Sequence, residues 1–258
     1  GGIWGGRQVV GRFFLDGFGN PTQKARWSGK ALSVAISEPK VGAHPKLLTT
    51  RADAVDGGYR ISGEKAWVSN GPVADAIIVI AITAQDGDRK RYSAFLVPRD
   101  TPGLSMEEMP GFHALRPSRH CHMVLDGCVV PADAMLGPEG TAYERMAMRF
   151  RDVEDAVGTY SALGAFQFIL GRLRSDERVE DRDLSLGALI ALQAVYEAGS
   201  AAVVATLDRG RLNAGSAVLV GLRVLALDMV QRIRTHVAAF GPVDAAVDTM
   251  LADLDAIL

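Results

Sequence analysis

Residues Trp67 to Ser69 combine an aromatic plane and a hydroxyl group in one short extended stretch. Side chains alternate along a strand, so Trp67 and Ser69 are expected on one face and Val68 on the other. An indole and a hydroxyl on one face suit a flat ligand with polar edges, such as an isoalloxazine ring. The ring could stack on the indole while the hydroxyl reached a ring nitrogen or oxygen. The alternative is that this face is only core and rim.

Ordered motifs flank this stretch. They are Ser37-Glu38-Pro39 with Gly42, Gly63-Glu64-Lys65-Ala66-Trp67, Phe95-Leu96-Val97-Pro98, Thr101-Pro102-Gly103-Leu104 and Val129-Val130-Pro131. In this order and at about these spacings, the sequence resembles the middle β-domain of the acyl-CoA dehydrogenase family. The resemblance covers residues 18 to 140 and is weaker beyond. It implies a flavoprotein oxidoreductase of fatty acid metabolism that binds FAD.

The resemblance also implies which residues meet the flavin. They are Val34, Ile36, Ser37, Gly42, Trp67, Val68 and Ser69. Two positions depart from the family pattern: Ala43-His44 follows Gly42 where the family has Ser-Asp, and Val34 replaces a common aromatic residue. The alternative for residues 37 to 42 is a plain β-turn.

The reaction implied by the resemblance is α,β-dehydrogenation of an acyl thioester. In the family a glutamate removes the α-proton and the β-hydride passes to flavin N5. Counted from Ala162-Leu163-Gly164, Glu154 falls where one subclass of the family carries this glutamate. On a helix with a buried stripe from Met146 to Val157, Glu154 lies about 80° from the stripe centre and Asp155 on the opposite face. A solvated surface carboxylate is the alternative for Glu154.

Features that the family uses elsewhere are missing from this sequence. Residues 1 to 30 correspond only to a remnant of the N-terminal helical domain, so the chain resembles a truncated or divergent member. The Arg-x-x-Phe-Gly motif for the FAD pyrophosphate has no match near residues 174 to 181, although the arginines at 172, 174, 178 and 182 could contact phosphate. Two alternatives therefore stay open: a non-catalytic partner or structural subunit, and a flavin monooxygenase on the same scaffold.

The elements that would position these residues fall into a β region and a helical region. Strands are expected at residues 32–36, 49–54, 59–69, 76–83, 92–97 and 123–125, separated by turn residues. From residue 140 the apolar period becomes helical and predicts three long helices and a short one. We therefore expect an α+β chain: a remnant at 1–30, an antiparallel β-barrel that binds flavin at 31–136 and a helical bundle at 137–258.

Composition adds few constraints. With 258 residues, 48% hydrophobic, 22% charged and a net charge of −2, the chain is ordinary globular protein, with no indication of nucleic acid binding. The longest uninterrupted apolar run, near residues 77–82, is too short to span a bilayer, and a cytoplasmic location is expected.

Cys121 and Cys128 are expected as reduced thiols. His120 and His122 share a strand face but lack a third ligand, so no metal is expected.

Assembly and partners follow partly from the helices and partly from the resemblance. The expected helices are apolar over much of their circumference, which predicts a homodimer or tetramer through the bundle. The resemblance implies an acyl-CoA-like thioester as substrate and an electron-transfer flavoprotein as candidate acceptor.

Overall fold

The computed structural model describes residues 9–109, 111–176, 184–241 and 244–258. It divides after Phe150 into two compact units, residues 1–150 and 151–258, which we describe separately. The elements of the first unit are η1 (Gly11–Asp16), α2 (Pro21–Trp27), β1 (Leu32–Ala35), β2 (Arg51–Val55), β3 (Gly58–Ser69), η2 (Gly71–Val73), β4 (Ala76–Asp86), β5 (Arg89–Pro98), β6 (Leu104–Glu108), β7 (His120–Pro131), η3 (Ala132–Ala134), β8 (Met135–Leu136) and η4 (Tyr143–Ala147). Helix α3 (Met148–Arg174) begins in this unit and continues into the second, which holds α4 (Leu184–Asp208), α5 (Ala217–Phe240) and α6 (Ala245–Ile257).

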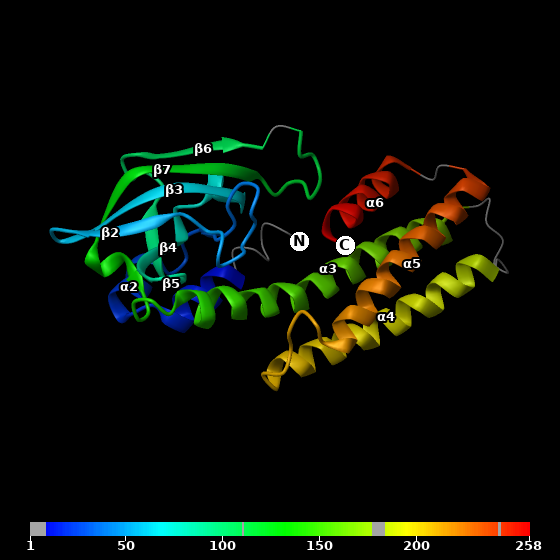
Figure 1. Cartoon of the computed structure of the whole chain (residues 1–258). Coiled ribbons are helices and arrows are strands. Elements are labelled where there is room, and N and C mark those ends of the chain that lie inside the picture. Colours follow the sequence, from blue (N-terminus) through cyan, green and yellow to red (C-terminus); the bar gives the residue numbers. More distant parts are fainter. Residues whose placement is uncertain (1–8, 110, 177–183, 242–243) are drawn as a thin grey trace. The chain divides into compact units, whose positions relative to one another are not determined.

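The β unit is one mixed sheet with the strand order β6-β7-β3-β2-β4-β5-β8, with β1 added in parallel to β4. Side chains from β3 and β7 share a buried cluster with side chains from β4 and β5, so the sheet curves until its two halves face each other (Figure 1). Among the described residues no pairing joins β6 to β8, so the expected closed barrel is wrong in this detail. The α+β class is confirmed.

Strand β4 is the centre of the β unit because both of its faces are covered. Ile77, Val79 and Ala81 belong to the cluster enclosed by the curved sheet. Ile78, Ile80 and Ile82 pack on the other side, against the N-terminal helical turns and the start of the long helix. The apolar run that is too short to span a bilayer is therefore a strand buried on both faces.

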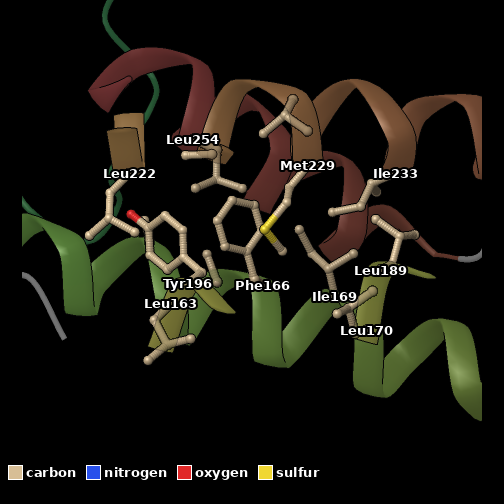
Figure 2. Packing of buried hydrophobic residues seen from close by; sticks show 14 of the residues in the cluster. Leu163, Phe166, Ile169, Leu170, Leu189, Tyr196, Leu222, Met229, Ile233 and Leu254 are labelled. Atoms are coloured by element: carbon tan, nitrogen blue, oxygen red, sulfur yellow. The ribbon is translucent and has the colours of Figure 1, made fainter. Parts of the chain in front are cut away.

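The helical unit is a bundle of α3, α4, α5 and α6 around one apolar core. Figure 2 shows Phe166 and Ile169 of α3 pointing toward Met229 and Ile233 of α5. Tyr196 of α4 packs edge-to-face on Phe166, with ring centroids 5.3 Å apart. Three long helices and a short one match the sequence prediction, as do all six predicted strands. The short strands β6 and β8 were not predicted, and β7 is much longer than expected.

The predicted buried stripe of the first long helix is wrong beyond Phe150. Val157, the last residue of the predicted stripe, is 39% exposed, and Tyr160, one turn further along the helix, is 45% exposed. Phe150 instead belongs to the core of the β unit, whereas the core of the bundle begins at Ala156 and continues through Leu163. Helix α3 thus serves two successive cores with different faces, which a single periodic stripe cannot represent.

Helix α4 is the one described helix that is long and apolar enough to cross a membrane by length and composition, with 22% of its apolar window buried. An apolar helix in a bundle passes the same test, so this finding does not establish a span. It does show a mostly uncovered apolar surface, with Leu184 88% and Val195 58% exposed.

Gly63 allows the backbone of β3 to pack closely against Thr50. Its φ is +146°, and a Cβ there would lie 2.6 Å from Thr50 Oγ1 and 2.7 Å from Thr50 Cα. We predict that Gly63→Ala destabilises the β unit by about 2 to 4 kcal/mol, because both the backbone and Thr50 must shift. Urea unfolding followed by circular dichroism measures this loss.

Gly87→Ala is the matched control. Gly87 also has a positive φ, of +55°, but nothing lies within 4 Å of the added carbon. Only the conformational cost of about 1 kcal/mol should remain. Equal losses in the two variants would show that contact with Thr50 is unimportant.

Candidate functional site

Two segments that are some thirty residues apart in the sequence lie side by side at the predicted flavin site. The Ala66 amide donates to the Ser37 carbonyl over 2.9 Å. The Ser33 hydroxyl donates to the Ser69 carbonyl over 2.7 Å. The end of β1 and the end of β3 are therefore neighbours, and the predicted residues of both segments come together in the β unit.

A buried ion pair holds these segments together. Lys65 Nζ lies 3.0 Å from Glu38 Oε1, and the two side chains are 0% and 3% exposed. Lys65 also donates to the Ile36 carbonyl. The Glu38 carboxylate accepts further hydrogen bonds from the Thr49 amide, the Thr49 hydroxyl and the Thr50 amide, at 2.7 to 2.9 Å. The turn that follows β1 is thus fastened to both β2 and β3.

Electrostatics show how this pair is balanced. Burial raises the pKa of Glu38, but the Lys65 charge and the hydrogen bonds from Thr50 and Thr49 outweigh it, and the net effect lowers that pKa to about 2. Burial lowers the pKa of Lys65 to about 8, against the opposing effect of Glu38. The Glu38 carboxylate accepts four hydrogen bonds, which favour its ionised form. The lowered pKa of Glu38 therefore governs the charge state of the pair. Both groups are charged at neutral pH.

Trp67 sits on a β-bulge that turns it outward. Lys65 pairs with Met123 and Val68 with Cys121, so β3 has one extra residue here. Trp67 has a φ of +59° and is 52% exposed, an unusual state for a bulky residue. Its indole packs edge-to-face against Phe112, with ring centroids 5.3 Å apart. The ring therefore offers an accessible face beside a partly buried aromatic neighbour.

Ser69 and Val68 take the faces that alternation predicted. Ser69 is exposed and Val68 is fully buried. Ser69 lies opposite His120 in the ladder, and its Oγ is 3.1 Å from His120 Nδ1. Because the Val68 side chain points into the core, only its backbone could meet a ligand.

The other predicted flavin contacts occupy mixed positions. Val34 and Ile36 are partly buried against the core on the outer side of β4, and Ser37 is also partly buried. Gly42, with a φ of +60°, is exposed in a turn in which it bridges to Glu38. A turn is therefore present, as the alternative for residues 37 to 42 expected, and whether it also meets flavin remains a prediction.

Glu154 and Asp155 on α3 have surroundings opposite to those expected: Glu154 is the exposed residue and Asp155 is the one that faces the bundle. Asp155 is not on a solvated far face: it pairs with Arg223 of α5 at 2.8 Å, and its side chain is 17% exposed. Glu154 is exposed and has no ion pair within the described parts of the chain. Loss of hydration and the Asp155 charge raise the pKa of Glu154 to about 7, against the effect of Arg151. Water still reaches this carboxylate and weakens the shift.

Two hollows on the surface of the described residues lie away from the predicted flavin site. One, of about 340 Å³, lies between α5 and α6 and includes Arg234 and Asp255. A second, of about 120 Å³, lies beside Trp27 and Leu96. Where the structure describes the chain, no three metal-ligating side chains gather, and both cysteines are free and buried. Arg178 and Arg182 lie outside the described residues.

Comparison with known proteins agrees with the motifs. The family model for the acyl-CoA dehydrogenase middle domain matches residues 33–128. A 2-methylacyl-CoA dehydrogenase of Solanum tuberosum is 38% identical over 128 residues, which are 47% of this chain. Residues 33–128 thus match the middle domain of acyl-CoA dehydrogenases. The match covers 31% of the potato enzyme, and the chain matches other relatives over 38% of their length.

Solved structures show that the likeness in fold extends beyond the middle domain. Butyryl-CoA dehydrogenase of Megasphaera elsdenii aligns with a TM-score of 0.78 at 24% identity, over 94% of this chain and 69% of that one. A glutaryl-CoA dehydrogenase of Mycobacterium smegmatis in complex with FADH2 aligns with a TM-score of 0.78 at 21% identity, over 99% of this chain and 69% of that one. At these identities the likeness concerns the fold alone.

Several residues that organise the site have no predicted role in the sequence. Glu38 and Lys65 lie in two of the motifs, and their opposite charges are the signal available in the sequence. His120 was weighed only as a metal ligand, and Phe112 was not considered. Both act through contacts between residues distant in the sequence, which periodicity does not reveal.

The Glu38–Lys65 pair predicts a pH dependence of stability. The pKa of Glu38 is about 2 in the folded chain against an ordinary 4.5. The stabilisation is therefore complete above about pH 4.5 and is lost as pH falls toward 2, by about 3 kcal/mol in total. Urea unfolding between pH 7 and pH 3 measures the slope. A flat profile in the wild type would contradict this account.

Glu38→Gln tests the same pair at neutral pH. It leaves Lys65 charged and buried without its partner, so we expect a loss of about 3 to 5 kcal/mol and a weaker acid dependence. Glu64→Gln, at an exposed position of β3 next to Lys65, is the control and should change little. Equal effects in the two variants would remove the special role of Glu38.

Proposed function

We propose that this protein is a flavin-dependent oxidoreductase that carries out α,β-dehydrogenation of an acyl thioester. The observation that carries the proposal is the exposed Trp67 indole beside the Ser69 hydroxyl, at the end of a strand held in place by the buried pair. The names of the relatives, which include a 2-methylacyl-CoA dehydrogenase, favour the same reaction class.

The residues present fit an isoalloxazine ring. A bulky aromatic ring that is 52% exposed, on a strand whose neighbouring residues are buried, provides a face for stacking. The Ser69 hydroxyl supplies a polar contact at the same edge. Val34, Ile36, Ser37 and Gly42 would contribute from the adjoining segment, and Val68 through its backbone. FAD, when bound, would supply the hydride acceptor.

Glu154 is the proposed base that removes the α-proton. A base works best when its pKa lies near the working pH, and the pKa of Glu154 is raised to about 7. Asp155, its neighbour, is held by Arg223 and is less available.

The second candidate function is a non-catalytic subunit. It is favoured by the absence of the Arg-x-x-Phe-Gly pyrophosphate motif near residues 174 to 181 of the sequence. A visible absorption spectrum of the purified protein after incubation with FAD separates the two. A bound flavin spectrum supports the oxidoreductase; its absence at high FAD concentration supports the subunit.

We also propose a homo-oligomer through the bundle, because α4 leaves large apolar side chains exposed. An electron-transfer flavoprotein as acceptor and a cytoplasmic location complete the proposal; the potato relative is named as mitochondrial.

Trp67→Ala should weaken FAD binding by about 1 to 3 kcal/mol through lost stacking and buried area. Ser69→Ala should alter the redox potential of the flavin more than its affinity. Fluorescence titration of FAD gives the affinities, and Trp27→Phe, at a buried indole, is the control for loss of a tryptophan. Unchanged binding in Trp67→Ala would show that the indole is not a cofactor wall.

Glu154→Gln keeps the volume of the side chain but removes the proton acceptor. Turnover of an acyl-CoA should fall by about two to four orders of magnitude while FAD binding stays nearly intact. Glu197→Gln, on the exposed surface of α4, is the control, because the neighbouring Asp155 holds Arg223 and is unsuitable for this purpose. Full activity in Glu154→Gln would refute this assignment.

A further inference from the structure

His120 is linked to both side chains that face the proposed flavin site, to Ser69 directly and to Trp67 through Phe112. Its Nδ1 lies 3.1 Å from Ser69 Oγ, across the antiparallel pair of β3 and β7. Its ring also packs edge-to-face on Phe112, with centroids 4.9 Å apart, and Phe112 packs in the same way on Trp67. One imidazole therefore touches the hydroxyl directly and the indole through one intervening ring.

The surroundings of the second ring nitrogen of His120, Nε2, indicate which nitrogen carries the proton. Nε2 is buried and has no hydrogen-bond partner within the described chain. A neutral imidazole carries one N–H, so either Nδ1–H donates to Ser69 and Nε2 is a bare lone pair, or Ser69 donates to Nδ1 and Nε2–H is left unpaired. An unpaired buried N–H is the rarer defect in folded proteins.

The doubly protonated ring is also disfavoured. Burial, and then the nearby charge of Arg116, lower the pKa of His120 below its ordinary value. At neutral pH the ring is therefore neutral. The tautomer with Nδ1–H is favoured, because it leaves an unpaired lone pair on Nε2 and no unpaired buried N–H. In this tautomer the Ser69 oxygen accepts from His120, and the Ser69 hydroxyl proton is directed away from the protein.

We propose that His120 is a positioning residue that holds Ser69 as a hydrogen-bond donor toward the bound ligand and supports the Trp67 indole through Phe112. This rests on the proposed function for the identity of the ligand, a flavin whose ring edge presents an acceptor nitrogen or oxygen. It goes beyond that function by assigning a residue outside the flavin-facing segments and by fixing the direction of the Ser69 hydrogen bond.

The tautomer of His120 can be measured without any flavin. Nitrogen-15 NMR of the imidazole groups, with His120→Asn used to assign the resonances, should show protonated Nδ1 and bare Nε2 in the wild type. Ser69→Ala removes the acceptor and should shift the ring toward the other tautomer. A protonated Nε2 in the wild type overturns the proposal, whether or not flavin binds.

Flavin binding then tests the two contacts separately. His120→Phe keeps an aromatic ring beside Phe112 but removes the hydrogen bond, so it should shift the flavin potential as Ser69→Ala does, with little further change in the double variant. His120→Asn keeps a donor near Nδ1 but loses the ring packing. It should preserve the potential and weaken FAD binding about two- to tenfold. His122→Phe, two residues along the same strand, is the control and should change neither.

The outcomes of these measurements are distinct. Additive shifts in the Ser69→Ala and His120→Phe double variant would overturn the coupling between the two residues, even if flavin binds. A wild-type protein that binds no FAD would refute the proposed function, and the tautomer alone would then decide whether His120 directs the Ser69 hydroxyl.

Discussion

The buried ion pair between Lys65 and Glu38 is the constraint on which the β unit depends. Removing two charges from water costs several kcal/mol, and the cost is recovered only where geometry and further hydrogen bonds satisfy both groups. Here Thr49 and Thr50 complete the shell of the carboxylate. Gly63 allows Thr50 to come close enough to do so. The pair therefore fixes how β2, β3 and the turn after β1 meet, as well as adding to stability.

The outward position of Trp67 follows from this arrangement. Lys65 must point inward to reach Glu38, and Ala66 is also buried. Two consecutive inward residues break the alternation of a strand, and the bulge supplies the extra residue that restores it. Trp67 then turns outward and Val68 returns to the core. The outward position of the indole thus depends on a polar contact beneath it, and Gly63, Lys65 and Trp67 each take part in the same local geometry.

The sequence predicted what depends on local pattern and missed what depends on distant partners. Alternation placed Trp67, Val68 and Ser69 on their observed faces, and helical periodicity found the long helices. Closure of the sheet was overestimated, because whether edge strands pair is decided at long range. The face of α3 was misjudged because Phe150 and Ala156 serve different cores. The functional roles of the flavin-facing residues and of Glu154 stay predictions, since side-chain positions alone do not reveal a ligand.

The orientation of α3 gives Glu154 and Asp155 different environments. Adjacent residues on a helix point about 100° apart, so Asp155 can turn into the bundle while Glu154 turns away from it. Asp155 is held by Arg223 in an ion pair of the bundle. Loss of hydration, and then the charge of Asp155, raise the pKa of Glu154, which has no ion pair of its own within the described residues. Two neighbouring carboxylates acquire different properties from their surroundings, as acid–base pairs in active sites do. We therefore propose Glu154 as the base on this difference in environment as well as on its place in the sequence.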